Sequence, residues 1–206
     1  GFQGVDVTAM AQFSVAAESL QKTLSTGSDA LRAFRVEEDG GLTAVSTLGA
    51  SAGMGVSAPS AIRIVAFDGK SYALVSAAGS SSISVAELGA GGQMVLTDHV
   101  VDTRDTRFAG VQAFATATKG DRVFVLAGGG DDGVTLFTLL PGGRLLQIGQ
   151  RLQAEGLVLD NITAMEAVVI GGKIEVFVAS EGKGITRLRI DPGPLPEIQL
   201  GGSGAD

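Results

Sequence analysis

Short apolar runs, in several of which hydrophobic and polar positions alternate, recur along the chain between glycine-rich turns. The alternation is clearest in "KIEVFVAS" at residues 173–180. A period of two residues predicts a β-strand with one face buried more deeply than the other. Gly40, Gly91, Gly142 and Gly193 follow one another at intervals of 51 residues, and each lies in a turn between two such runs. The sequence therefore predicts a β-hairpin at each of these glycines.

A second hairpin precedes each of the last three turns, at Gly69, Gly120 and Gly172. Each unit is then expected to hold four strands, A to D, and the D strands are expected in "LTAVSTL", "QMVLTDHV", "RLLQIGQ" and "LPEIQL". The units are expected near residues 5–58, 59–109, 110–160 and 161–200, with 201–206 as a separate tail. The core between units is predicted to contain Leu74, Ile83, Val125, Val134, Val176 and Ile185.

A four-stranded unit repeated at this period is typical of a β-propeller blade. One such sheet cannot bury both faces alone, whereas radial stacking covers the faces between neighbours. We therefore expect an all-β propeller of about four blades; a tandem of hairpins in a sandwich or solenoid is the alternative. A small ring, an arc of a larger ring and two copies forming eight blades all remain open. The arc is favoured, because the array starts without a Met and without a capping unit.

The first unit departs from the repeat. "DVTAM" at residues 6–10 resembles "NITAM" at 161–165 and predicts the first strand. Where the second strand is expected, Ala16, Leu20 and Leu24 follow the spacing of one helical face. This unit therefore contains either a substituted helical element or a damaged blade.

Composition narrows the class of protein. The 206 residues are 45% hydrophobic and 18% charged, which indicates a globular chain. The net charge of −7 argues against nucleic acid or an anionic membrane as the partner, and the apolar runs are too short to span a bilayer. The chain has no cysteine, which excludes disulfides and thiolate metal sites. An acidic, glycine-rich, cysteine-free chain resembles bacterial proteins exported unfolded in one step, as in type I secretion. We therefore expect an extracellular or cell-surface location without a cleaved signal.

Candidate chemistry is sparse. The only histidine, His99, is expected in a solvated loop, and no second histidine exists for a metal pair or a catalytic triad. The densest charged cluster contains the predicted partner-binding residues Asp102, Arg104, Asp105 and Arg107. Arginine can bind a carboxylate through two parallel hydrogen bonds, although such charges can also pair with each other in solvent.

The repeats resemble a known group. "GDRVFVLAGGGDDGVTLFTLLPGGRLLQIG" and "FDGKSYALVSAAGSSSISVAELGAGGQMV" resemble propeller repeats of the lactonase-like and YVTN-like superfamily. They are most similar to propellers that precede haemolysin-type calcium-binding repeats in large secreted alphaproteobacterial proteins. The terminal "GGSGAD" matches the opening of such a calcium-binding nonapeptide repeat, or is a plain spacer. Asp206, together with Asp131 and Asp132 in a glycine loop, is accordingly a candidate calcium ligand.

The expected function is that of a scaffold. In propellers the B–C and D–A loops emerge on one face, where binding residues usually lie. The predicted channel-lining residues Thr8, Arg63, Gln112 and Thr163 do not make a convincing catalytic set. We therefore expect a non-catalytic structural or adhesive module that binds a protein, a glycan or further copies of itself. A lactonase-like hydrolase is the alternative, and it rests on the resemblance alone.

Overall fold

A computed structural model describes residues 9–13, 22–27 and 29–193, with side-chain environments from Asp29 onward. The described residues form antiparallel sheets in chain order, three with four strands and one with three. The strands are β1 Ala9–Phe13, β2 Lys22–Gly27, β3 Ala30–Val36 and β4 Leu42–Leu48; β5 Pro59–Phe67, β6 Lys70–Ala77, β7 Ser82–Leu88 and β8 Met94–Val101; β9 Ala113–Lys119, β10 Arg122–Gly128, β11 Gly133–Leu140 and β12 Arg144–Leu152; and β13 Ile162–Ile170, β14 Lys173–Ser180 and β15 Gly184–Ile190. One 3₁₀ turn, Ala50–Ala52, follows β4.

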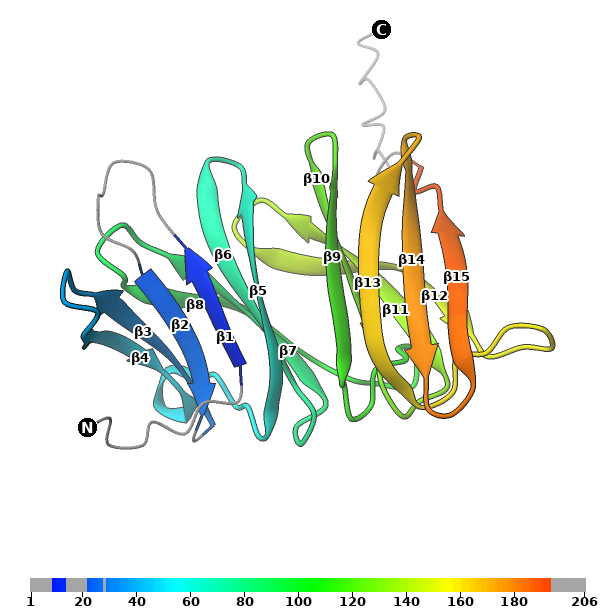
Figure 1. Ribbon diagram of the computed structural model, residues 1–206, viewed down its shortest axis with the longest axis horizontal. Helices are drawn as coiled ribbons and strands as arrows, with labels where there is room; N and C mark the ends of the chain where they lie inside the picture. Colours follow the sequence, from blue (N-terminus) through cyan, green and yellow to red (C-terminus); the bar gives the residue numbers. More distant parts are fainter. Residues whose placement is uncertain (1–8, 14–21, 28, 194–206) are drawn as a thin grey trace, which may run out of the picture.

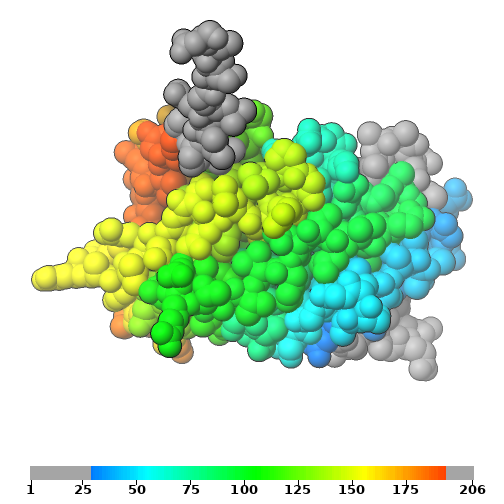
Figure 2. All heavy atoms as spheres, turned by 180° about the vertical axis from the view of Figure 1, so that it is seen from behind, coloured from blue at the N-terminus to red at the C-terminus, as the bar shows by residue number. Residues whose placement is uncertain are grey.

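The four sheets stack side by side in an open arc. The first strands of successive sheets contact one another in series, β1 with β5, β5 with β9 and β9 with β13. The β1 and β13 sheets lie at opposite ends of the row (Figure 1). Seen from behind, the outer strands form successive bands, and the yellow loop after β12 projects from the edge (Figure 2). The all-β, propeller-like prediction is confirmed.

The predicted hairpins are present wherever both strands are described. The turns at Gly40, Gly91 and Gly142 join β3 to β4, β7 to β8 and β11 to β12. The turns at Gly69, Gly120 and Gly172 join the first and second strands of the last three sheets. Gly193 follows β15, and the strand expected in "LPEIQL" lies outside the described residues.

The interfaces between neighbouring sheets are called seams below. The first two seams contain equivalent hydrogen bonds, one repeat apart. The Ser46 hydroxyl donates to the Gly92 carbonyl at 2.6 Å, and the Thr97 hydroxyl donates to the Gly143 carbonyl at 2.9 Å. Gly143 has a φ of +77°, and a Cβ there would lie 2.5 Å from both Thr97 Oγ1 and a Tyr72 ring carbon. Glycine is therefore required at this turn, because the preceding sheet packs directly on its backbone.

The hydrophobic core is divided among the three seams. The middle cluster contains Leu74, Ile83 and Val125, while Val134 and Val176 belong to the cluster between the last two sheets. These five core predictions are confirmed, since all five side chains are at most 3% exposed. The prediction for Ile185 is wrong: its side chain is 75% exposed. It lies on the outer face of the last sheet, which no further sheet covers among the described residues.

The first sheet corrects the helical alternative. Leu24 lies in β2, which pairs with β1 on one side and with β3 on the other. A helix through Leu24 is therefore wrong, and the expected second strand is present. Ala16 and Leu20 lie outside the described residues. The helical spacing of Ala16, Leu20 and Leu24 covers only two turns, which is a weak signal. The hydrogen bonds of β2 to strands on both of its edges outweigh it.

The outer face of the last sheet mixes apolar and charged side chains. Its exposed apolar residues are Val168, Ile170, Phe177 and Ile185. Beside them the carboxylate of Glu175 accepts hydrogen bonds from Arg187 Nε at 2.8 Å and Arg189 Nε at 2.6 Å. These two guanidinium groups lower the pKa of Glu175 to about 2 from its ordinary 4.5.

The lowered pKa of Glu175 makes its contribution to stability depend on pH. Because the folded state favours the ionised carboxylate, this contribution is complete above pH 4.5 and is lost as the pH falls through about 2. We expect Glu175→Gln to unfold at lower urea concentration than the natural chain at pH 7, with the difference disappearing by about pH 2. Glu38→Gln, in an exposed turn, is the control. A difference that does not vary with pH would contradict the ionic origin of the effect.

Candidate partner-binding loop face

The B–C and D–A loops contact one another along one edge of the stacked sheets. The loop after β8 is tied to the β6–β7 loop, because Asp102 N donates to the Ser81 carbonyl and Gly110 N donates to the Ser81 hydroxyl. It is also tied to the β10–β11 loop, because Gly130 N donates to the Ala109 carbonyl. This D–A loop thus bridges two neighbouring sheets, and the loops form one continuous face, as the sequence predicts.

Close packing fixes the backbone at the centre of this face. A Cβ on Gly129 would lie 2.4 Å from the Ala109 carbonyl oxygen and 2.9 Å from that of Gly110. Only glycine permits this approach of two backbones. The glycine run in the β10–β11 loop therefore serves to let the neighbouring D–A loop cross it.

The four predicted partner-binding residues divide into two pairs. The Asp102 carboxylate accepts hydrogen bonds from the Thr106 hydroxyl at 2.8 Å and from Phe108 N at 3.0 Å, so it holds the loop in shape. Arg107 lies 3.5 Å from the Asp131 carboxylate and joins this loop to the β10–β11 loop. Arg104 and Asp105 are exposed and project from the loop. The first pair organises the loop, and the second pair is exposed to solvent.

The calcium candidates are not brought together into a site by the described residues. Asp131 faces a guanidinium group, which competes with a cation for its oxygens. Asp132 has a φ of +49° and turns the loop. In the described part of the chain no group of three or more acidic or histidine side chains could hold a metal ion. Asp206 lies outside that part, so the calcium hypothesis stays a prediction, and the described residues alone do not fit the ion.

A small polar pocket lies on the same face, between the third and fourth sheets. Its volume is about 50 Å³. It is lined by Gln112, Gly129, Gly130, Asn161, Ile162, Thr163 and Glu181. The sequence singled out Gln112 and Thr163 as channel-lining residues and missed Asn161 and Glu181. Asn161 ends the D–A connection and Glu181 begins the B–C connection. These positions were the available signal, because Glu181 N donates to the Asn161 carbonyl where the two loops meet.

His99 is not a loop residue. It lies in β8, opposite Ser84 of β7, whose hydroxyl is 2.8 Å from His99 Nδ1. The pairing of β7 with β8 continues on both sides of a bulge between Val85 and Ala86, so the strand includes polar residues that suggested a loop. The His99 side chain is half-buried.

The comparisons establish the type of fold and no family. No protein-family model and no curated protein matches the chain. Solved structures do resemble it. A functionally unknown protein from Desulfotomaculum acetoxidans matches with a TM-score of 0.55 and 19% identity over 89% of this chain and 62% of that one. The SapL1 lectin, in complex with α-methyl fucoside, matches with a TM-score of 0.56 and 10% identity over 89% of this chain and 61% of the lectin.

A third structure is an exo-β-1,3-galactanase from Phanerochaete chrysosporium with bound β-1,3-galactotriose. It matches with a TM-score of 0.51 and 11% identity over 81% of this chain and 40% of the enzyme. The chain thus spans less than two thirds of each of these proteins. In the part that the structure describes, no helix is both long and apolar enough to cross a bilayer. None of these matches singles out the lactonase-like or haemolysin-type groups. At these identities the likeness establishes a propeller-type all-β fold and nothing finer.

Proposed function

We propose that this chain is a non-catalytic, secreted or surface-exposed propeller module that binds a glycan through its loop face. The observation that carries the proposal is the joining of the loop after β8 to the β10–β11 loop by Arg107 and Asp131. Arg104 and Asp105 are exposed on the loop after β8, and the same loop lines the polar pocket through Gln112. Sugar hydroxyls both donate and accept hydrogen bonds, and this face offers guanidinium, carboxylate, amide and hydroxyl groups.

Two of the three similar structures support the choice of a glycan. The lectin holds α-methyl fucoside, and the galactanase holds β-1,3-galactotriose. The pocket of about 50 Å³ accommodates part of a sugar ring, so most of a bound saccharide would lie across the neighbouring loops. The secreted or surface location rests on the acidic, cysteine-free composition. Recovery of the intact protein solely from the cytosol would contradict it.

A charge-reversal experiment tests the binding face. Methyl α-fucoside and β-1,3-galactotriose are titrated into the chain by calorimetry, followed by a panel of larger glycans. Arg104→Glu/Arg107→Glu should weaken the binding of a glycan hit about tenfold or more, which corresponds to ~1.4 kcal/mol. The matched control is Arg35→Glu/Arg144→Glu, which likewise changes one ion-paired and one exposed arginine, away from the loop face.

Three outcomes of that experiment would contradict the role of the loop, the choice of a glycan or the non-catalytic assignment. Unchanged affinity in the Arg104/Arg107 variant would show that this loop is only a solvated edge. Absence of binding to every glycan at millimolar concentration would overturn the glycan proposal. Release of monosaccharide from β-1,3-galactotriose, abolished by Glu181→Gln, would overturn the non-catalytic assignment.

A further inference from the structure

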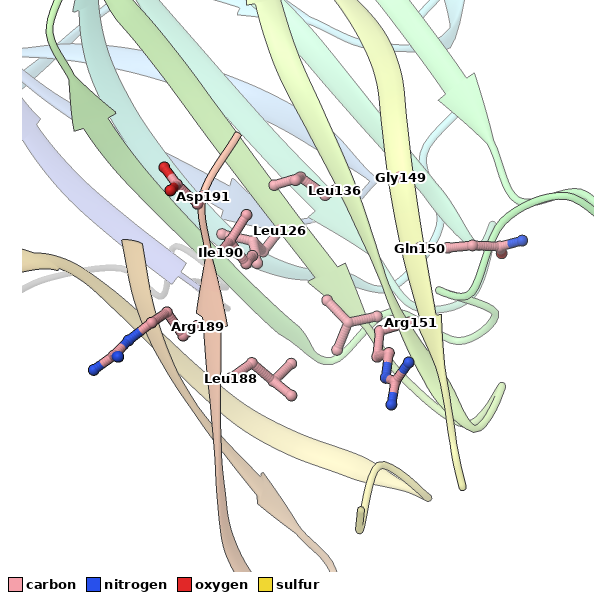
Figure 3. A pocket seen from close by; sticks show the side chains of 10 residues that line it. Leu126, Leu136, Gly149, Gln150, Arg151, Leu188, Arg189, Ile190 and Asp191 are labelled. Atoms are coloured by element: carbon pink, nitrogen blue, oxygen red, sulfur yellow. The ribbon is translucent and has the colours of Figure 1, made fainter. Parts of the chain in front are cut away.

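A wide groove lies between the third and fourth sheets, at the outer rim. Its volume is about 410 Å³. It is lined by Leu126, Val134, Leu136, Gly149, Gln150, Arg151, Leu188, Arg189, Ile190 and Asp191. Figure 3 shows that the side chains of Leu126, Leu136 and Ile190 point toward one another across it, whereas Arg189 points away. The floor of the groove is therefore continuous with the apolar cluster between the two sheets.

The groove coincides with an unpaired strand edge. In the first three sheets the third strand has a fourth strand beside it. In the last sheet, among the described strands, β15 pairs only with β14. An uncovered edge leaves backbone donors and acceptors without partners and invites another strand to pair there.

We propose that residues 195–200, "LPEIQL", occupy this groove as the fourth strand of the last sheet, paired with β15 of the same molecule. The chain reaches the groove in the right place. Asp191 lines the groove, and its carboxylate is held by Lys119 at 3.2 Å and by Lys173 at 2.6 Å. Arg122 donates to the Gly193 carbonyl at 2.6 Å. Six residues of strand extend about 20 Å, close to the length of β15.

The repeat of 51 residues predicts the register of this strand. The second and third sheets keep the same pairing one repeat apart: Leu88 lies opposite Met94, and Leu139 lies opposite Leu145. The pairing of the second with the third strand also carries over to the last sheet, since Val125–Phe137 becomes Val176–Leu188. If the pairing of the third with the fourth strand is moved on by one further repeat of 51 residues, Ile198 lies opposite Leu188 and Glu197 lies opposite Arg189.

This register fits the chemistry of both faces. Leu188 belongs to the apolar cluster at the groove, so Ile198 beside it would cover the open floor. Leu96, which lies two repeats before Ile198, packs in the same manner against the apolar cluster between the first and second sheets. On the opposite face Glu197 would lie beside Arg189, which extends a row of alternating charge that begins with Glu175. Opposite charges in directly paired positions stabilise a sheet.

A hydrogen bond between the second and third sheets also supports placing residues 195–200 beside β15, because both of its partners are changed one repeat later. In that seam Leu145 N donates to the Asp98 carboxylate at 2.7 Å. One repeat later the acceptor position is Gly149 and the donor position is Pro196, which has no N–H. Because the N–H at this position points to the neighbouring sheet and not into the ladder, proline there removes no strand hydrogen bond. Donor and acceptor are therefore replaced together, as expected if Pro196 lies beside Gly149.

A pair of engineered disulfides tests the register, and the cysteine-free chain makes the readout clean. Leu188→Cys/Ile198→Cys should form an intramolecular disulfide under mild oxidation. The matched control, Leu188→Cys/Glu197→Cys, is shifted by one residue, which turns the second thiol to the other face. We expect it to react at least about tenfold more slowly, because the thiols of opposite faces do not meet. Products are identified by non-reducing electrophoresis and peptide mass spectrometry.

Hydrogen exchange gives an independent readout. In the full chain the amides of Arg187 and Arg189 should be protected, since alternation along β15 directs them to the new strand. Ile198→Asp should remove that protection, whereas Gln199→Asp should leave it. Equal crosslinking in both cysteine pairs, crosslinking in neither, or unprotected amides in the natural chain would each overturn the proposal. A disulfide found only between two molecules would show that the strand is exchanged between copies and would overturn pairing within one molecule.

Discussion

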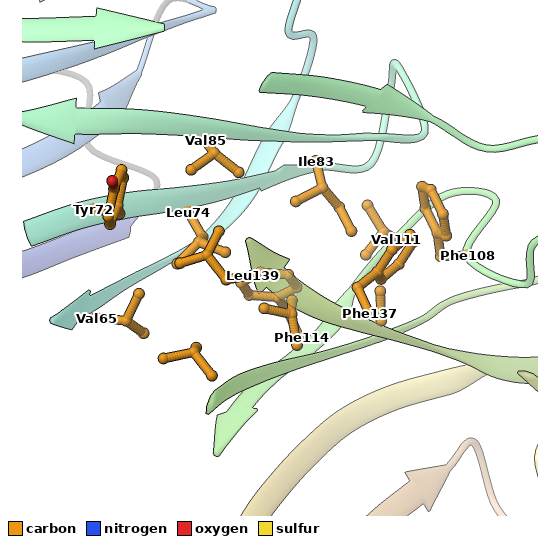
Figure 4. Packing of buried hydrophobic residues seen from close by; sticks show 13 residues of the cluster. Val65, Tyr72, Leu74, Ile83, Val85, Phe108, Val111, Phe114, Phe137 and Leu139 are labelled. Atoms are coloured by element: carbon orange, nitrogen blue, oxygen red, sulfur yellow. The ribbon is translucent and has the colours of Figure 1, made fainter. Parts of the chain in front are cut away.

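Replacing Phe137 with alanine should lower the free energy of unfolding by about 3–5 kcal/mol. Phe137 is 2% exposed and lies in the cluster between the second and third sheets (Figure 4). Its ring meets that of Phe108 edge to face, with centroids 5.8 Å apart. Truncation therefore removes apolar burial, the aromatic contact and the filling of a close-packed seam together. Chemical denaturation followed by circular dichroism measures the change.

Val95→Ala is the control for the Phe137 experiment. Val95 lies in β8 and its side chain is 63% exposed, so the substitution should change the free energy of unfolding by less than about 0.5 kcal/mol. A reduction below about 1 kcal/mol for Phe137→Ala would show that this seam is not close-packed, contrary to the structure. Because sheets in an array contact only their neighbours, the unfolding transition should also be checked for a second step.

The chain should self-associate through the outer face of its last sheet, and two lysines there should make it monomeric. Val168 and Ile185 are 42% and 75% exposed, and Ile170 and Phe177 lie on the same face. In the array such a face is covered by the next sheet, and an uncovered apolar face promotes association. Val168→Lys/Ile185→Lys places two positive charges where two copies would meet. Sedimentation velocity over a hundredfold range of protein concentration measures the effect.

Val95→Lys/Leu146→Lys provides the matched control for self-association. These side chains are 63% and 40% exposed, and they lie on the outer strands of the two middle sheets. The control should associate like the natural chain. A natural chain that is monomeric at every concentration, or a control that dissociates equally, would contradict the role of this face.

The turns and the division into sheets could be predicted from the sequence because their causes are local. Gly91 and Gly142 recur at a fixed interval, and a tight turn favours glycine where φ is positive, as it is at Gly142. The alternation in "KIEVFVAS" likewise directs Ile174, Val176 and Val178 to one face, and all three are buried. Periodicity of this kind is a property of neighbouring residues, so the sequence alone is enough to predict it.

Whether an apolar position is buried depends on what packs against the sheet. Val134 and Ile185 hold corresponding positions in the repeat, yet Val134 is 3% exposed and Ile185 is 75% exposed. Val134 faces the fourth sheet, and Ile185 faces no described element. Arg187 and Arg189 stand on that face where β11 has Leu136 and Thr138, and they were the local sign that it is open to solvent. Ile185 taken alone does not differ in kind from Val134.

The candidate site was only partly predictable for the same reason. The sequence alone determined that Asp102, Arg104, Asp105 and Arg107 form one charged loop, because they are neighbours along the chain. Only the tertiary structure decided that Asp102 and Arg107 hold the loops together, leaving Arg104 and Asp105 exposed. It also brought Asn161 and Glu181 beside Gln112, through loops that lie 20 or more residues apart. Such contacts arise from the stacking of whole sheets, which a local sequence pattern does not encode.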